Sequence, residues 1–389
     1  MLRGHPLQSS SAGSNVSLIY LDYNRTTPVA PSVLQAMEPF WSTHYMLPGQ
    51  DHAHAQLISE ALENAREGLA ALVGCEPFEV IFTSGGTESN NLAILGMLAK
   101  KQPGHVLVSV LEHDSVVSAA HSLGQGWMIQ TVDCGVDGLV DPEYLQSLIR
   151  EDTRLVCLQA ANPVLGTLQP VREVADICHT RGVPLHCDAT QVFGKLPTDV
   201  TQLRADTVAI SGHKFYGPKG SGALYVRRGL EISPIAFGEP REMGLRPGSE
   251  NVPACVGLGA AAALAARCSV DVSDNLAVLR DRLADGLQAV LDPAPWVACE
   301  NSPRLPNTLT FRLGCNAKRI QQATRDLAMA SAQSHNPPDE MTRMLRAIGC
   351  SDEEIERTIR VSVGWTTSRD QIDRAIDLIA AGWDSVVSC

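Results

Sequence analysis

A short glycine-rich segment, Thr83 to Asn91, follows a β-rich run and opens a helical pattern. Glycine lets a backbone approach an anion closely, and a helix N-terminus offers free N–H groups at the positive end of its dipole. The segment therefore predicts a phosphate cradle. No Walker lysine follows it, which weighs against a nucleoside triphosphatase, and an ordinary turn before a helix is the alternative interpretation.

An aspartate, Asp188, directly follows an expected strand at Pro184–Cys187 and has no basic neighbour in the sequence. Its carboxylate could be a metal ligand, a catalytic base, or the partner of a protonated heteroaromatic nitrogen. It could equally cap a helix, because Ala189, Thr190 and Gln191 follow in a capping-like pattern. Asp188 by itself does not decide between these roles.

A lysine, Lys214, lies 26 residues beyond Asp188 and follows an expected strand at Asp206–Ile210. An amine beside hydroxyl and imidazole groups suits Schiff-base chemistry, provided that burial or nearby positive charge keeps part of it neutral. The alternative is a solvated lysine in the turn Lys214–Lys219.

The order of these three segments is more specific than any one of them. A phosphate cradle, an aspartate at a strand end and a lysine at a strand end together describe a pyridoxal phosphate site. The helix N-terminus holds the phosphate, Asp188 keeps the pyridine nitrogen protonated, and Lys214 carries the aldehyde.

Such a site requires strands whose carboxyl ends meet at one edge of a sheet. A helix is predicted over His52–Val73 by apolar spacings of three and four, with Gly74 ending it. β-rich runs then alternate with helical patterns, which predicts an α/β domain with a mainly parallel sheet covered on both faces. The expected strands are 79–82, 105–110, 127–132, 154–159, 184–187, 206–210 and 222–226, and the expected helices between them are 88–100, 114–123 and 171–179.

The pattern changes near Val256, where helices are expected at 256–267 and 274–291. Strands at 296–299, 307–313 and 358–363 follow, and Ser368 with Gln371 forms a capping box for a last helix at 370–386. We therefore expect a flexible tail over residues 1–17 and a large domain over 18–261, whose first residues pack on the small domain. The small α+β domain is expected over 262–389.

The composition excludes several classes of protein. With 31 basic and 43 acidic residues the net charge is −12, which argues against a nucleic acid or an anionic membrane as partner. The 11 cysteines form no Cys-x-x-Cys pair, so no metal site is expected. The longest apolar stretch, Val256 to Ala266, is shorter than the roughly 18 residues that span a bilayer. With no secretory apolar region at the start, a reduced, cytoplasmic protein is expected.

From Ile19 to about Val386 the chain resembles the class V aminotransferase-like enzymes, which use pyridoxal phosphate and have the type I fold. Within them it is similar to the cysteine desulfurases and selenocysteine lyases, with 22–24 and 246–251 nearest to the selenocysteine lyase branch. The resemblance rests on the motifs at 20–24, 26–28, 83–91, 112–113, 162, 166–167, 188–191, 211–214, 246–251 and 360–364.

The resemblance implies a role for each matching position. Lys214 is expected to hold the cofactor aldehyde and move protons, Asp188 to pair with the pyridine nitrogen, and Gln191 to bond the phenolic oxygen. His113 is expected to stack over the ring and to act in catalysis. The groups implied at the phosphate are Gly86, Thr87, Ser211, His213 and, reaching across a homodimer from the other subunit, Ser249.

On the substrate side the resemblance implies that Arg360 binds the carboxylate of an amino acid, with Asn162 beside it and in contact with the cofactor. The chain departs from the family pattern at Arg25, where the family has alanine. A second guanidinium there could hold a distal carboxylate.

The largest departure is the missing nucleophile. Desulfurases carry a cysteine on a loop that corresponds here to Leu327–Pro338, and that stretch contains none. Counting back from Ala347 places Ser334 at the cysteine position, whereas the local match points to Gln333. Neither can carry a persulfide, and Cys315 and Cys350 lie off the expected loop.

We therefore expect a pyridoxal phosphate-dependent lyase that breaks a C–S or C–Se bond in a cysteine-like amino acid, without a persulfide-forming cysteine. A selenol or sulfinate leaves more readily than a thiol, which favours selenocysteine or cysteine sulfinate. Two alternatives remain: another class V reaction, transamination or α,β-elimination, or a silent cofactor-binding partner of a sulfur-transfer enzyme.

Overall fold

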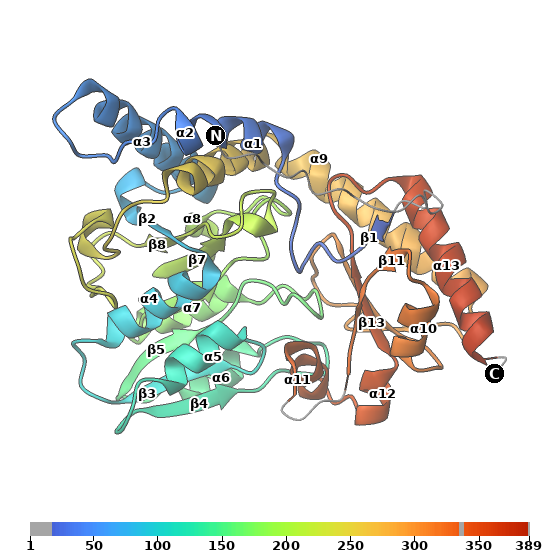
Figure 1. Ribbon diagram of the computed structural model, residues 1–389. Helices are drawn as coiled ribbons and strands as arrows, with labels where there is room; N and C mark the ends of the chain where they lie inside the picture. Colours follow the sequence, from blue (N-terminus) through green and yellow to red (C-terminus); the bar gives the residue numbers. More distant parts are fainter. Residues whose placement is uncertain (1–17, 334–337, 388–389) are drawn as a thin grey trace.

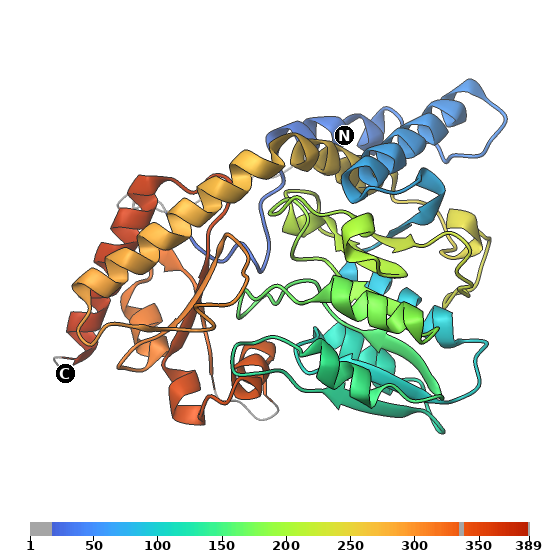
Figure 2. The ribbon, with the colours of Figure 1, turned by 180° about the vertical axis from the view of Figure 1, so that it is seen from behind.

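The computed structural model describes residues 18–333 and 338–387 (Figure 1). A large body built on a broad sheet carries most of the first half of the chain, and a smaller body holds the C-terminal part. The long helix α9 (Val252–Val290) runs from one body to the other, which Figure 2 shows from behind.

The large sheet has seven strands, and it is mainly parallel as expected. Its order is β2-β8-β7-β6-β5-β3-β4, with antiparallel pairing only where β8 meets β2 and β7. The strands in that order are Val80–Thr83, Gly222–Val226, Thr207–Ser211, Leu185–Asp188, Thr153–Cys157, His105–Ser109 and Met128–Val132.

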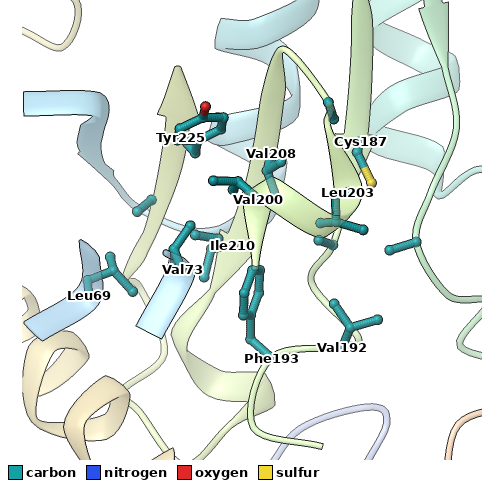
Figure 3. Packing of buried hydrophobic residues seen from close by; sticks show 14 of the residues in the cluster. Leu69, Val73, Cys187, Val192, Phe193, Val200, Leu203, Val208, Ile210 and Tyr225 are labelled. Atoms are coloured by element: carbon teal, nitrogen blue, oxygen red, sulfur yellow. The ribbon is translucent and has the colours of Figure 1, made fainter. Parts of the chain in front are cut away.

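Apolar side chains cover both faces of this sheet, because successive residues of a strand point to opposite sides. In β2, Phe82 packs in the core that α3, α7 and α9 cover, whereas its neighbour Ile81 packs under α4 and α5. Figure 3 shows part of the first core, where Val208 and Ile210 of β7 lie among Leu69, Phe193 and neighbouring side chains. The helices of the large body are α1 Pro31–Met37, α2 Pro39–Ser42, α3 Ala53–Val73, α4 Gly86–Leu98, α5 Asp114–His121, α6 Pro142–Leu148, α7 Val171–Thr180 and α8 Val200–Leu203.

The small body is built on a four-stranded sheet of order β12-β13-β10-β9. A further strand from the start of the chain, β1 (Ile19–Tyr20), pairs in parallel with β11 (Leu327–Ala328). The described part of the chain therefore starts on the small body before it enters the large one. The remaining elements are β9 Trp296–Val297, β10 Thr308–Arg312, α10 Ala317–Ala323, β12 Ala330–Ser331, α11 Glu340–Ala347, α12 Asp352–Glu356, β13 Thr358–Ser362 and α13 Arg369–Val387.

Two predicted helices, 256–267 and 274–291, form the two parts of α9. The six residues between them contain neither glycine nor proline, so nothing in the sequence ends the first helix. Residues up to Ala265 pack in the large core and those from Leu276 in the small one. We propose that the boundary between the large and the small domain lies at residue 261, so that the chain passes from one domain to the other within α9.

The other predicted strands and helices of both bodies are confirmed to within a few residues, and the capping box is present. Ser368 N–H donates to Gln371 Oε1 at 2.9 Å, and Gln371 N–H donates to Ser368 Oγ at 3.2 Å. In the described ranges no single helix is long and apolar enough to cross a membrane. Among the described residues, only the two parts of α9, Val252–Arg267 and Asp271–Val290, are together long and apolar enough, and a bend of 79° separates them.

Helix α9 crosses α3 with the two backbones in close contact. A Cβ on Gly259 would lie 2.5 Å from Ala65 Cα and 2.8 Å from Ala65 O, closer than atoms can approach. On the facing helix, a Cβ on Gly68 would meet Gly259 O at an ordinary 3.4 Å.

We expect Gly259→Ala to lower the free energy of unfolding by about 1–3 kcal/mol, because the helices must move apart. The matched control is Gly68→Ala, which has room for its methyl group and gains up to about 1 kcal/mol of helix propensity. Urea unfolding of both variants checks this, and equal stability of the two would contradict the close contact.

Candidate active site

A cavity of about 270 Å³ lies at the carboxyl ends of β6 and β7, where the large body faces β13 and α11. Ten of the twelve site residues expected from the sequence line it: Arg25, Gly86, Thr87, His113, Asp188, Gln191, Ser211, His213, Lys214 and Arg360. A larger open groove of about 860 Å³, near Thr153, Pro184 and Asp206 at the amino ends of the strands, contains none of them.

Lys214 ends the short 3₁₀ turn Gly212–Lys214 that follows β7. Its Nζ donates to the carbonyl oxygens of Asn24 at 2.7 Å and Arg25 at 3.1 Å. Burial lowers the pKa of this amine to about 8; Arg360 and Arg25 also lower it, and Glu340 and Asp188 partly oppose them. A larger share of Lys214 is therefore neutral near pH 7 than of a solvated lysine, as attack on a carbonyl requires.

Asp188 is the last residue of β6 and is 6% exposed. Its Oδ2 accepts a hydrogen bond from Asn90 Nδ2 at 2.8 Å, and its Oδ1 accepts from Thr190 N–H at 3.0 Å. The latter bond is the predicted cap, although a turn and not a helix follows. Asn90 also pairs with His186 Nε2 at 3.0 Å, and burial lowers the His186 pKa to about 4, so that imidazole is neutral.

The expected phosphate cradle lies at the start of α4, where the chain passes close to another segment. A Cβ on Gly86 would lie 2.8 Å from Thr190 Cγ2, so a side chain at this position requires Thr190 to shift. Ser211 and His213 face the same cavity from the end of β7. Burial, assisted by the charge of Lys214, lowers the pKa of His213 to about 4, and its Nδ1 pairs with Thr26 Oγ1 at 3.1 Å.

Arg360 of β13 presents a buried guanidinium to the cavity. One nitrogen pairs with Asp22 and another donates to Pro163 O at 3.2 Å, whereas Nε has no partner among the described residues. The buried Oε1 of Glu340, at the start of α11, likewise has no partner there. Unpaired buried polar atoms are costly, and those at a cavity mark where a ligand is expected to bind.

His113 both lines the cavity and caps α5. Its Nδ1 accepts the Ser115 N–H at 3.0 Å and lies 2.7 Å from Ser115 Oγ, which fixes the ring in place. Capping and cavity lining are therefore combined in one residue.

Two expected residues lie away from the cavity. The Oδ1 of buried Asn162 accepts the N–H groups of Val164 at 2.9 Å and Leu165 at 2.8 Å, so this side chain shapes a turn. Ser249 is exposed on a loop outside the cavity of its own chain, and its expected role in a partner subunit's site stays a prediction.

The two candidates for the missing nucleophile differ in what can be said of them. Ser334 lies outside the described residues. Gln333 is described, and its backbone oxygen accepts a hydrogen bond from Thr342 Oγ1 at 2.6 Å. Cys315 and Cys350 do not line the cavity, and burial raises the pKa of both thiols, which disfavours the reactive thiolate.

Sequence reasoning assigned no role to several cavity residues, most notably Asn24, Asn90 and Glu340. Asn24 and Asn90 stand inside motifs that the sequence had singled out, so their position was available as a signal. Glu340 follows residues 327–338, and no local pattern in the sequence marks it.

The residues of this cavity fit pyridoxal phosphate. A helix N-terminus with a glycine cradle suits the phosphate, a buried carboxylate suits a ring nitrogen, and a partly neutral amine suits the aldehyde. Arg360 lines the cavity with its guanidinium held by Asp22 and Pro163 O, which suits the carboxylate of an amino acid.

The comparisons with known proteins agree with this geometry. The family model "Aminotransferase class-V" matches residues 19–375. The chain is 36% identical over 367 residues to cysteine desulfurase IscS 1 of Archaeoglobus fulgidus, covering 92% of this chain and 95% of that protein. It is 36% identical over 376 residues to cysteine desulfurase IscS of Rickettsia felis, covering 95% and 92%.

Solved structures are similar over the same length. A NifS-like protein superposes with a TM-score of 0.88 at 29% identity, covering 94% of this chain and 99% of that one. SspA in complex with cysteine superposes with a TM-score of 0.79 at 32% identity, covering 88% and 98%.

Beneath the cavity, Glu112 is a fully buried carboxyl group. Its Oε1 accepts the Gln159 N–H at 2.6 Å, and its Oε2 has no partner among the described residues. Burial, with repulsion from Asp188, raises the pKa of Glu112 to about 8.

The unfolded chain therefore ionises Glu112 near pH 4.5, but the folded chain only near pH 8. Glu112 makes its full contribution to the free energy of unfolding below pH 4.5. Between pH 4.5 and pH 8 this contribution falls by up to about 1.4 kcal/mol per pH unit, and it is lost once the pH has risen through 8. We expect Glu112→Gln to remove this loss, which urea unfolding at pH 5.5 and pH 8.5 measures. The exposed Glu67→Gln should behave as wild type; an unchanged pH slope in Glu112→Gln would show that Glu112 is ionised in the folded protein.

Proposed function

The chain belongs to the aminotransferase class-V family, and we propose that it cleaves the bond to sulfur or selenium in a cysteine-like amino acid. It is a pyridoxal phosphate-dependent enzyme with an amino-acid substrate. The observation that carries the proposal is that the partly neutral amine of Lys214 and the arginine Arg360 line one and the same cavity.

In this proposal the cofactor is held by residues from several strand ends. The start of α4 at Gly86 and Thr87, with Ser211 and His213, holds the phosphate. Asp188 would accept a hydrogen bond from the ring nitrogen, and His113 would cover one face of the ring.

Pyridoxal phosphate, when bound, supplies an electron sink that stabilises negative charge at the Cα of the amino acid. Arg360 orients the substrate by its carboxylate, with Asp22 and Pro163 O holding the guanidinium in place. Lys214 removes the proton from Cα, a step for which its lowered pKa suits it, and later returns a proton to product.

We propose that the substituent on the β-carbon of the substrate is attached through a polarisable atom, sulfur or selenium, because two relatives are cysteine desulfurases by name. Residues 327–338 contain no thiol, and a serine hydroxyl such as that of Ser334 is a poor acceptor of sulfur at neutral pH. We therefore propose that selenocysteine or cysteine sulfinate, whose leaving groups depart without a protein thiol, is handled better than cysteine.

We further propose a cytoplasmic homodimer. The nine described cysteines are all free, which is in keeping with a reducing compartment. Ser249 lies on an exposed loop that Arg246 fastens to the first turn of α4, with Nε 3.2 Å from Glu88 Oε1. The exposed side chain of Ser249 is proposed to reach the phosphate site of a partner subunit.

The central test is Lys214→Ala. We expect it to abolish the visible absorption band of the bound cofactor and to lower turnover at least about a hundredfold, because the proton at Cα loses its base. Turnover is followed by a product screen with cysteine, selenocysteine, cysteine sulfinate and aspartate, scoring alanine against pyruvate.

The control for this test is Lys219→Ala, an exposed lysine five residues further on, which should keep both the band and the activity. Alanine with elemental selenium or sulfite as co-product supports the proposal. Pyruvate as the main product would assign the alternative elimination, and no spectral response to any amino acid would assign the silent binding partner.

A second candidate function is favoured by Arg25, whose exposed guanidinium lines the same cavity as Arg360. Two guanidinium groups suit a substrate with two acidic groups, such as aspartate or cysteine sulfinate, and aspartate would direct the enzyme to another class V reaction.

We expect Arg25→Ala to lower kcat/KM for aspartate and cysteine sulfinate by about tenfold to a hundredfold, the loss that one charged hydrogen bond gives. The kcat/KM for cysteine should stay within about threefold. Arg228→Ala, which removes an exposed arginine away from the cavity, controls for net charge. An equal loss for all substrates would reject the role of Arg25.

A further inference from the structure

A second lysine, Lys195, is buried directly behind the site. It lies in the turn that follows Asp188 and is only 4% exposed. Its Nζ donates to Gln191 Oε1 at 2.6 Å and to Asn24 Oδ1 at 3.1 Å. It does not line the cavity, so no direct contact with a ligand follows from its position.

The electrostatic surroundings of Lys195 are unfavourable for a charge. Burial lowers its pKa well below the ordinary value, and the charges of Lys214 and Arg360 lower it further. In the described part of the chain no carboxylate pairs with its Nζ, and both of its acceptors are side-chain amides. A lysine is expensive in such a place, since an apolar side chain would fill the volume without the cost of desolvation.

The acceptors show what the lysine does. Asn24 has its orientation fixed independently, because its Nδ2 donates to Pro163 O at 2.9 Å and a carbonyl can only accept. Asn24 Oδ1 must therefore face Lys195, which donates to it whether or not it is charged. Gln191 Oε1 receives the shorter bond from the same Nζ.

Two bonds set the orientation of the Gln191 amide, and the bond from Lys195 is the shorter of the two. With Oε1 held by Lys195, Nε2 must point the other way, and one of its N–H groups reaches Asn24 O at 3.2 Å. Gln191 lines the cavity, so its second N–H is the group available there. Without Lys195 only the longer bond from Nε2 to Asn24 O holds the amide, so its second N–H is held toward the cavity less firmly.

We propose that Lys195 is a positioning residue that locks Gln191 as a hydrogen-bond donor toward the cavity, where the phenolic oxygen of the cofactor is expected. This rests on the proposed function, which supplies the cofactor. A hydrogen-bond donor at the phenolic oxygen stabilises the ionised form of that oxygen. It therefore lowers the pH at which the bound cofactor would lose its proton.

The experiment is a pH titration of the visible absorption band in the holoenzyme reconstituted with pyridoxal phosphate. We expect Lys195→Met to raise the midpoint by roughly half a unit to one unit, the effect of losing one hydrogen bond. Gln191→Met should raise it similarly. Adding Lys195→Met to Gln191→Met should then give little further shift, since both changes remove one donor.

The control is Lys101→Met, which removes an exposed lysine from the far end of the sheet and should leave the midpoint unchanged. An unchanged midpoint in Lys195→Met overturns the proposal. So does a shift of the same size when Gln191 is already replaced, because Lys195 would then act by its charge alone. An equal shift in Lys101→Met would assign the effect to net charge and also overturn it.

Groups that bear on the titration from other elements are Lys214, Arg360, Asp188, Glu340 and Arg25, and all of them are retained in every variant. If Lys195→Met does not fold, Lys195→Gln is titrated in its place, and the same upward shift is expected because the shorter side chain cannot reach both acceptors. A wild-type protein that forms no Lys214-dependent band would refute the proposed function instead, which distinguishes the two failures.

Discussion

The site depends on Asn24, which joins both bodies of the molecule and the reactive amine in one hydrogen-bond system. Its carbonyl oxygen accepts Lys214 Nζ, while its own N–H donates to Ser362 Oγ of β13 at 2.9 Å. Its Nδ2 donates to Thr308 Oγ1 of β10 at 2.8 Å. A change in the angle between the bodies must therefore alter the environment of Lys214, because the same residue contacts both.

The second constraint is positive charge with limited access to water. Lys195, Lys214 and Arg360 lie in and behind one cavity. The acceptors of the two amines are carbonyl and amide oxygens, whereas Arg360 also pairs with Asp22. Neutral acceptors satisfy the N–H groups without cancelling the charge, so the amines release protons more easily than they do in water. The same potential attracts anionic groups, which is the property expected of a site for phosphate and carboxylate.

Most strands of the large sheet were predictable because they are apolar runs buried on both faces, a pattern that a parallel sheet imposes, whereas the edge strand β4 is largely exposed. The short helices α6 and α12 were not predicted, although their caps are visible in the sequence. Ser351 and Glu354, for example, form a capping box at the start of α12. These helices have too few residues to display an apolar period, so the cap was the one usable signal.

The sequence by itself determined the chemistry: the glycine cradle, Asp188 and Lys214 occur in an order that few sites share, and all three reach one cavity. Only the tertiary structure decided which other side chains face it. Asn162 turns away to serve a backbone turn, whereas Asn24, Glu340 and, one layer behind, Lys195 join the site. The physical reason is distance along the chain. Asn24, Lys195 and Arg360 are separated by well over a hundred residues, and no local pattern records a contact that exists only once the sheet and the small body have assembled.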